Sequence, residues 1–193
     1  MKHLILGSNS PRRRELLAGL DIPFTVDTLN TFVERFSPDT PHERIPSLLS
    51  EGKSLGFHRR LNEDEVLLTA DTMVLLHDRG DKSPILGKPG DRQEAIAMLR
   101  ALSGRTHEVI TAVTVRDSSH LETASDSTLV TFRVLADKEI EYYVDKYRPM
   151  DKAGAYGVQE WIGYVGITRI EGSFYNVMGL PLHIVYQLLN KFL

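Results

Sequence analysis

Three consecutive arginines stand at the start of a predicted helix, where cations are electrostatically disfavoured. The segment Gly7-Ser8-Asn9-Ser10-Pro11-Arg12-Arg13-Arg14 lies between a short apolar run and a helical pattern. Ser10 is a suitable N-cap, and Pro11 fits the first helical position because it has no amide proton to lose. Each arginine there opposes the helix dipole by about 0.3 to 1 kcal/mol. Because free amides, the dipole and guanidinium groups all attract anions, the segment predicts a phosphate site.

Asp71 carries a second chemical signal, because it lies in an apolar run. Residues Val66 to Leu76 are apolar enough for a buried central strand. Burying an unpaired carboxylate is strongly unfavourable, so Asp71 needs a cation, a metal, hydrogen-bond donors or a raised pKa. A purely structural alternative is a carboxylate tied to a neighbouring backbone group or arginine. In a regular strand Thr72 points to the opposite face, so one ligand touches both only at a bulge or strand end.

Two lysines and a loop glutamate complete a set suited to polyphosphate chemistry. Lys88 lies in the rigid turn Gly87-Lys88-Pro89, Lys53 lies on a predicted helix, and Glu34 lies in a polar loop. Each alone is ordinary, since a lone lysine is usually solvated and a loop glutamate is common. With the arginines and Asp71 they supply cations for phosphate oxygens and two carboxylates for magnesium, which takes few such ligands.

The composition limits the classes of function. The 193 residues are 41% hydrophobic, with a net charge of −3 and a pI near 6.2. This balance argues against a sequence-independent nucleic-acid binder, which is usually basic. The chain has no cysteine, which excludes disulfides and thiolate chemistry; with no signal-peptide pattern, we expect a cytoplasmic protein. Since a membrane span needs about 20 apolar residues, we expect no membrane partner.

Several other catalytic motifs are missing from the sequence. The segment Gly7 to Arg14 lacks the second glycine and the Lys-Ser/Thr pair of a P-loop. No Gly-x-Ser-x-Gly elbow and no His-x-x-x-His pair is present. His107 begins a predicted strand, and we interpret it as a hydrogen-bonded structural residue rather than a catalytic base.

The elements that position these residues alternate between strand and helix. Pro46, Gly52 and Gly56 favour a broken helix in the second helical region, and Asp137 is the predicted cap of the fourth. Arg79-Gly80-Asp81-Lys82 is a predicted turn, and residues 30–41 form a polar loop. Strands are predicted over 4–6, 23–27, 65–77, 106–117, 121–135 and 164–170, and helices over 11–20, 43–61, 91–102, 137–147 and 181–192.

Eight motifs follow one another along the chain in a characteristic order. They are Ser8-x-Ser10-Pro11-Arg12-Arg13, the Glu34 loop, Lys53, Ala70-Asp71-Thr72, Gly87-Lys88-Pro89, Leu102-Ser103-Gly104-x-x-His107, the segment Asp151 to Gln159, and Gly172-Ser173 with Gly179-Leu180-Pro181. In these motifs the chain resembles the Maf family of nucleoside triphosphate pyrophosphatases from end to end. The resemblance implies an α/β fold in one domain over 1–193, with an elongated mixed β-sheet flanked by helices and a central cleft. It also implies a possible homodimer.

The resemblance implies hydrolysis of a nucleoside triphosphate to the monophosphate and pyrophosphate with Mg²⁺ or Mn²⁺. Members that act on dTTP and UTP carry Arg, Thr and Gln at three positions, as Arg12, Thr72 and Gln159 do here. Members that act on 7-methyl-GTP carry Trp, Gln and Glu instead. The chain therefore resembles the dTTP/UTP subgroup, with modified pyrimidine nucleotides as further candidate substrates.

The resemblance also implies roles for individual residues. Asp71 is expected to act as the general base toward the attacking water, and Glu34 with Asp71 to hold the metal. Arg14 is expected to be solvated. Further substrate contacts are expected from Ser8, Ser10, Arg13, Lys53 and Lys88.

The chain departs from the family pattern at two places. Gly52 and Ser54 flank Lys53, where helix-favouring residues are usual, and Glu160-Trp161 follow Gln159, where a small, glycine-rich run is typical.

Two other functions fit parts of the sequence. A non-hydrolytic protein that senses nucleotides and regulates cell division would use the same cations, but it gains nothing from Asp71 and Glu34 near the phosphates. An aspartyl-phosphate phosphatase requires a second aspartate two residues after the nucleophile, and Met73 occupies that place.

Overall fold

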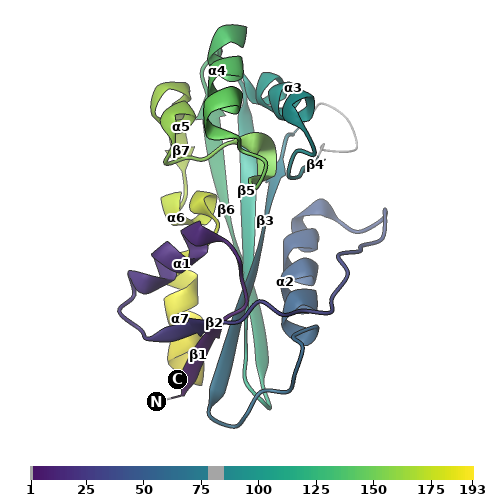
Figure 1. Cartoon of the computed structure of the whole chain (residues 1–193), viewed down its shortest axis with the longest axis vertical. Helices are drawn as coiled ribbons and strands as arrows, with labels where there is room; N and C mark the ends of the chain where they lie inside the picture. The colour runs from purple at the N-terminus through teal and green to yellow at the C-terminus, as the bar shows by residue number, and fades with distance from the viewer. Residues whose placement is uncertain (1, 78–84) are drawn as a thin grey trace. The chain divides into compact units, whose positions relative to one another are not determined.

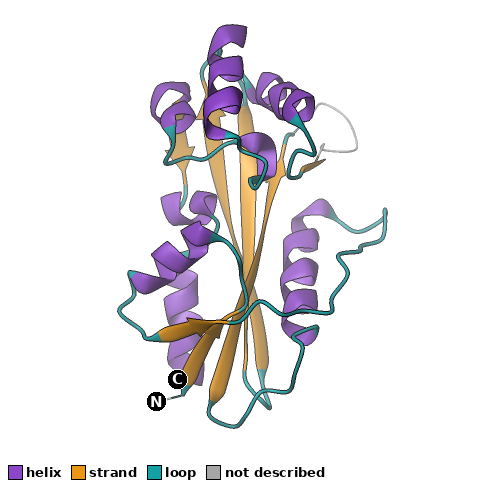
Figure 2. Ribbon diagram, viewed as in Figure 1, coloured by secondary structure: helices purple, strands orange, loops and turns teal. Residues whose placement is uncertain are grey.

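Short apolar runs of the sequence form the strands of a mixed β-sheet. The computed structural model describes residues 2–77 and 85–193, and the turn predicted at Arg79–Lys82 lies outside them. Within these residues, seven strands form one open sheet in the order β2-β1-β3-β5-β6-β7, with β4 paired to β3 (Figure 2). The strands are β1 (His3–Leu6), β2 (Phe24–Val26), β3 (Glu65–Leu75), β4 (Ile85–Leu86), β5 (Thr106–Arg116), β6 (Leu121–Phe132) and β7 (Ile167–Glu171).

The sheet contains both parallel and antiparallel pairs, and helices flank it. β1 is parallel to β2 and to β3, whereas β4 is antiparallel to β3 and β7 is antiparallel to β6. The predicted α/β class with a mixed, helix-flanked sheet is confirmed. The helices are α1 (Pro11–Ala18), α2 (Ile45–Leu55), α3 (Arg92–Leu102), α4 (Asp137–Tyr147), α5 (Trp161–Gly166), α6 (Phe174–Met178) and α7 (Leu182–Phe192), with 3-10 turns η1 (His42–Arg44) and η2 (Ala153–Ala155).

The chain forms two compact units. The first comprises residues up to Thr72, Thr111–Asp126 and Gly179–Leu193, and the second comprises Met73–Ile110 and Ser127–Met178. The long strands β3, β5 and β6 contribute residues to both units. A single domain over 1–193 stays a prediction.

In the first unit, α1 and α2 contact opposite faces of β3. Lys53 of α2 contacts Asp71, whereas Arg13 of α1 contacts Thr72, the next residue of the strand. Successive side chains of a strand point to opposite faces, so the two helices lie on either side of it. Figure 1 shows α1 and α2 on either side of β3.

α2 packs on the sheet through buried serines rather than through large apolar side chains alone. Ser50 and Ser54 are fully buried. The Ser50 hydroxyl lies 2.8 Å from Thr114 Oγ1 and 3.2 Å from the Thr69 carbonyl, and Arg116 Nη2 donates to the Ser54 carbonyl at 2.8 Å. These contacts explain the departure at Ser54, because a larger side chain would separate the helix from the strands.

The second unit has a large apolar core between its helices and the sheet. Leu99 and Leu102 of α3, Tyr143 of α4, Phe132 of β6 and Ile162 of α5 are all at most 1% exposed and belong to one cluster. α3 begins as predicted, because the Asp91 side chain accepts a hydrogen bond from Glu94 N at 2.9 Å.

Several local predictions are wrong. α2 runs unbroken through Gly52, and Pro46 is tolerated because it lies in the first turn, where no amide donor is required; the helix ends at Leu55 rather than at 61, with Gly56 as its C-cap. The N-cap of α4 is Ala136 rather than Asp137, and Glu139 Oε2 accepts from the Ala136 amide at 2.8 Å.

A further error lies near the C-terminal end of the sheet. The strand predicted over 164–170 begins only at Ile167, because residues 161–166 form α5; α6 was not predicted. β3 and β6 also end earlier than expected, at Leu75 and Phe132.

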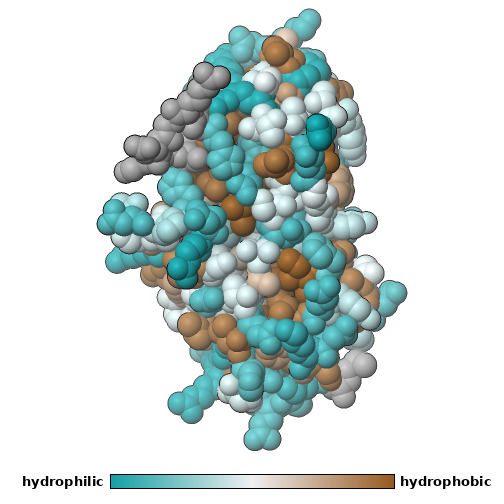
Figure 3. All heavy atoms as spheres, turned by 180° about the vertical axis from the view of Figure 1, so that it is seen from behind, coloured by the Kyte–Doolittle hydropathy of each residue, from teal (hydrophilic) through white to brown (hydrophobic). Residues whose placement is uncertain are grey.

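The surface mixes polar and apolar residues. On the face in Figure 3, hydrophobic residues are interspersed among hydrophilic ones. Within residues 2–77 and 85–193, none of the helices has the length and apolar character that crossing a membrane requires.

Candidate active site

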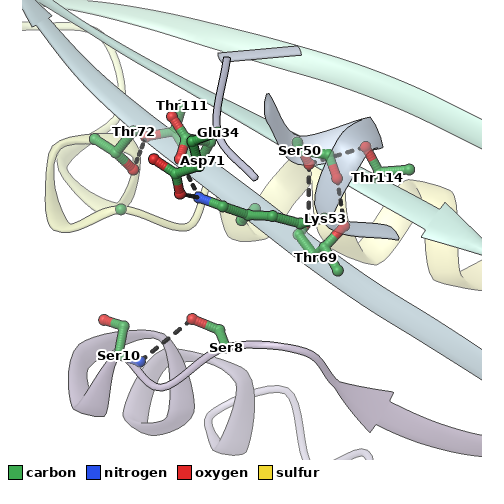
Figure 4. Close-up of polar contacts among 12 residues, drawn as sticks. Ser8, Ser10, Glu34, Ser50, Lys53, Thr69, Asp71, Thr72, Thr111 and Thr114 are labelled. Atoms are coloured by element: carbon green, nitrogen blue, oxygen red, sulfur yellow. Dashed lines mark hydrogen bonds and ion pairs between the residues drawn. The ribbon is translucent and has the colours of Figure 1, made fainter. Parts of the chain in front are cut away.

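The predicted strand, turn and helix at the N-terminus are confirmed. The amide of Gly7 donates to the Leu68 carbonyl at 2.8 Å, which ties the turn to β3. Ser10 caps α1 by accepting from Arg13 N at 3.4 Å, and the Ser10 amide donates to Ser8 Oγ at 3.3 Å. Figure 4 shows both hydroxyl groups on this turn. The structure therefore places Ser8 and Ser10 at the N-terminus of a helix, where an anion is favoured.

Arg13 is held by three separate segments of the first unit. Its guanidinium donates to the Gly179 carbonyl at 2.8 Å, the Ala70 carbonyl at 2.9 Å, Thr72 Oγ1 at 3.0 Å and Ser8 Oγ at 3.4 Å. These bonds use four of its five N–H groups. Burial lowers the pKa of Arg13, and the charge of Asp71 opposes this shift.

The other two arginines of the turn differ from each other in exposure. Arg12 is partly buried, and Arg14 is exposed, as expected for a solvated residue. The three arginines therefore differ in environment although they are consecutive in the sequence.

Lys53 lies between the two predicted metal ligands. Its Nζ atom is 2.5 Å from Asp71 Oδ1 and 2.8 Å from Glu34 Oε1 (Figure 4). The Asp71 side chain is 13% exposed and that of Glu34 is 58% exposed, so Asp71 is the more desolvated carboxylate. Burial raises the pKa of Asp71, and the charge of Lys53 acts in the opposite direction. Of the options that the sequence left open for Asp71, the structure shows a cation, which is Lys53.

Thr72 points away from the group formed by Asp71, Lys53 and Glu34. Its Oγ1 accepts from Arg13 and lies 2.9 Å from Thr111 Oγ1 on β5. β3 continues to Leu75, so the strand does not end between Asp71 and Thr72. The two side chains therefore follow the ordinary alternation of a strand.

The carboxylates of Glu34 and Asp71 suit a divalent cation whose remaining ligands are phosphate oxygens and water. Both lie within 2.8 Å of one ammonium group, so their oxygens already converge on one positive charge. Across the described parts of the chain, no group of three or more His, Cys, Asp or Glu side chains could hold a metal. Mg²⁺ is commonly bound by one or two carboxylates together with phosphate oxygens and water, which matches this pair.

Lys88 belongs to the second unit, on a turn tied to η2. The Gly87 carbonyl accepts from the Gly154 amide at 3.0 Å. Lys88 is exposed and the following Pro89 is buried, so the turn fixes the backbone at Lys88 while the side chain extends into solvent.

Gln159 also belongs to the second unit and has an unpaired acceptor. Its Oε1 atom is buried without a hydrogen-bond partner among the described residues, and its carbonyl accepts from Tyr164 Oη at 2.5 Å. The neighbouring Glu160 lies 3.1 Å from Lys152 Nζ and accepts from the Tyr143 hydroxyl. The departure at Glu160 thus supplies a partly buried ion pair beside Gln159.

His107 has the structural environment predicted for it. It is fully buried, its Nε2 lies 2.7 Å from Tyr156 Oη, and burial lowers its pKa to about 3. The imidazole is therefore neutral near pH 7.

Sequence reasoning missed two partners of the site. Thr111 contacts Thr72, and the Gly179 carbonyl accepts from Arg13. A signal for Thr111 existed, because it is a polar residue within the mostly apolar stretch 109–115 of β5. Gly179 has a φ of 107°, which favours glycine and explains this residue in its motif.

The comparison with known proteins identifies the family. A family model described as Maf-like protein matches residues 3–192. The chain belongs to the Maf family. This confirms the resemblance found in the motifs, from the N-terminal turn to the last helix.

Three relatives of this Maf chain are each named dTTP/UTP pyrophosphatase. The protein of Porphyromonas gingivalis is 48% identical over 191 residues, which cover 98% of this chain and 94% of its own length. That of Bacteroides thetaiotaomicron is 46% identical, covering 97% and 95%. That of Christiangramia forsetii is 44% identical, covering 98% and 94%.

Proposed function

We propose that this Maf chain hydrolyses dTTP and UTP to the nucleoside monophosphate and pyrophosphate, assisted by Mg²⁺ or Mn²⁺. The observation that carries the proposal is the position of Lys53 Nζ, 2.5 Å from Asp71 and 2.8 Å from Glu34. It combines a desolvated carboxylate, a second carboxylate and a cation at one point. The relatives named dTTP/UTP pyrophosphatase support the choice of substrate.

Asp71 is the proposed general base. A water oxygen attacks the α-phosphorus, Asp71 takes its proton, and the bond to the oxygen between the α- and β-phosphorus breaks so that pyrophosphate leaves. Burial raises the pKa of Asp71, and this makes the carboxylate a stronger proton acceptor than an exposed one.

Glu34 and Asp71 are the proposed metal ligands. When bound, the metal supplies charge neutralisation and polarisation of the phosphate oxygens. Lys53 is already beside this pair, and it provides a further positive charge for the triphosphate.

The remaining predicted contacts have separate roles. Ser8 and Ser10 donate hydrogen bonds to phosphate oxygens at the start of α1, and Lys88 neutralises charge on the leaving pyrophosphate. Arg13 fixes the turn through its four hydrogen bonds and contributes its charge to the phosphates.

Gln159 is the proposed reader of the base. Its buried Oε1 has an unsatisfied acceptor, which suits the imide N–H of uracil or thymine, and its amide group donates to a base carbonyl. Arg12 contributes to the choice between substrate classes, and Thr72, on the other face of β3 from Asp71, contributes through Arg13, which donates to its hydroxyl. Pyrimidine nucleotides modified away from the imide edge are further candidate substrates.

We propose three further properties: the chain forms a homodimer, it is located in the cytoplasm, and it has no nucleic-acid partner. The dimer rests on the family resemblance, and the other two rest on the composition and the net charge of −3.

The alternative is a protein that binds dTTP or UTP without cleaving it.

The deciding assay incubates the purified chain with dTTP, UTP, the other deoxynucleoside triphosphates and 7-methyl-GTP, in Mg²⁺, Mn²⁺ or EDTA. Pyrophosphate and orthophosphate are detected separately. We expect pyrophosphate as the first product, from dTTP and UTP above all, and none in EDTA. Orthophosphate as the first product contradicts the proposal, and binding without any release favours the sensor.

A further inference from the structure

Phe32 lies against two glycines at the C-terminal end of α2, which are Gly52 within the helix and its C-cap Gly56. A Cβ atom at Gly52 would be only 2.2, 2.3 and 2.8 Å from three atoms of the Phe32 ring. A Cβ atom at Gly56 would be 2.6 Å from the Cβ and 2.8 Å from the amide nitrogen of Phe32. Residues four apart share one helix face, so the ring and backbone of Phe32 approach a face without side chains.

Hydrogen bonds fix the backbone beside this ring. Asn30 Nδ2 donates to the Lys53 carbonyl at 2.6 Å, and its Oδ1 accepts from the Phe32 amide at 2.7 Å. The Thr31 amide donates to the Gly56 carbonyl at 2.8 Å. In Figure 1, the segment that joins β2 to α2 passes the helix before it turns back into it. The contacts therefore attach residues 30–32 to the C-terminal part of α2.

Phe32 is the side chain that attaches the following residues to the helix. Of residues 31–39, all of which the structure describes, Phe32 alone is partly buried and the others are exposed. Glu34 follows two residues later and reaches Lys53 Nζ at 2.8 Å although 58% of its side chain is exposed. A glycine within a helix costs about 1 kcal/mol relative to alanine. Gly52 therefore weakens α2 and, in return, leaves room for the ring.

We propose that Gly52 and Phe32 are positioning residues for Glu34. The helix glycine admits the Phe32 ring, and this contact keeps Glu34 beside Lys53 and Asp71. The inference rests on the proposed function, in which Glu34 holds the metal. It also gives a physical reason for the departure at Gly52, because alanine there would displace the ring.

The test compares G52A, F32A, the double variant and the matched control G19A. A Cβ atom at Gly19 meets only the Leu16 carbonyl, at 3.3 Å, and the residue has a φ of −68° that alanine adopts readily. Trypsin cleavage after Arg35 is followed by mass spectrometry, because it reports release of the segment independently of activity. The Mn²⁺ concentration for half-maximal hydrolysis of dTTP reports the position of Glu34, and thermal unfolding checks the fold.

We expect G52A to accelerate cleavage after Arg35 by about tenfold, because proteolysis follows the population of the released segment. It should also raise the required Mn²⁺ concentration by about tenfold, because loss of a residue that orients a metal ligand weakens metal binding by about this factor. F32A should reproduce both effects. The double variant should be no worse than F32A, because the added Cβ then meets no ring. G19A should match the wild type.

Three outcomes contradict the inference or separate it from the proposed function. If G52A and F32A both behave like G19A, the positioning role is wrong. Faster cleavage with an unchanged Mn²⁺ requirement shows that the ring attaches the segment but does not position Glu34, which also overturns it. If the wild type hydrolyses no triphosphate in the presence of metal, the proposed function is wrong. The rates of trypsin cleavage then decide by themselves whether the contact of Phe32 with Gly52 holds the segment against α2. If G52A does not fold, F32A decides.

Discussion

At the scale of single residues, Asp71 is the group on which the proposed chemistry depends most directly. Replacing it with asparagine keeps the shape and removes the proton acceptor. We expect D71N to lower kcat for dTTP by at least about 100-fold, because general-base catalysis contributes that much or more. Lys53 retains Glu34 as a partner at 2.8 Å, so the variant should stay folded. Steady-state kinetics with circular dichroism checks this, and full activity of D71N would contradict the role.

Arg13 and Arg14 are adjacent in the sequence but have different structural roles. Arg13 donates to Ser8, Ala70, Thr72 and Gly179. Its removal leaves buried carbonyl groups unpaired, so R13A should lower the free energy of unfolding by about 2 to 4 kcal/mol. The exposed Arg14 gives the control, for which we expect about 0.5 kcal/mol or less. Urea unfolding of both variants measures the difference, and equal losses would contradict it.

Some of these residue environments were predictable, and others were not. A buried carboxylate needs compensation, so the sequence predicted that Asp71 would have a cation, a metal, hydrogen-bond donors or a raised pKa; that the compensating group is Lys53 was not predictable. Ser10 was predictable as a cap because the capping interaction is local. The contact between Phe32 and Gly52 joins residues whose sequence pattern carries no sign of it, because it depends on how the loop folds back on α2.

At the scale of elements, local patterns predicted most helices and strands, and tertiary packing decided the exceptions. The alternation from Tyr164 onward resembles a strand, yet its first residues belong to α5. A Cβ atom at Gly163 would lie 2.0 Å from the Val158 carbonyl, and one at Gly166 would lie 2.9 Å from the Phe132 ring. The close packing of this short helix depends on these two glycines, and a propensity argument counts both against a helix.

The start of α4 offers a test at the same scale. Glu139 accepts from the Ala136 amide and forms two bonds with Arg133, whereas Asp137 pairs with Arg100 while 68% of its side chain is exposed. We expect E139A to lower the free energy of unfolding by about 1 kcal/mol and D137A by about half of that or less. Chemical denaturation compares the two variants. A larger loss of unfolding free energy in D137A than in E139A would indicate that Asp137 is the N-cap.

At the scale of the whole molecule, ion pairs in both units couple the stability of the fold to pH. In the first unit, the hydrogen bonds from Arg59 lower the pKa of Glu65 to about 2. In the second unit, the hydrogen bonds from Arg133 lower the pKa of Glu139 to about 2. Hydrogen bonds, the strongest of them from Lys2, also lower the pKa of Asp117. These carboxylates bind protons more weakly in the folded than in the unfolded chain.

The sign of the pH dependence follows from this difference. The stabilisation is complete above the unfolded pKa of a glutamate, near 4.3, and is lost as the pH falls toward 2. Between pH 5 and pH 3 we expect the free energy of unfolding to fall by about 1 kcal/mol for each glutamate pair, because solvent screening reduces the effect of partly exposed pairs. Urea titrations at several pH values measure this slope. The double variant E65Q/E139Q, less stable at pH 7, should show a flatter dependence; an unchanged slope would assign the acid sensitivity to other groups.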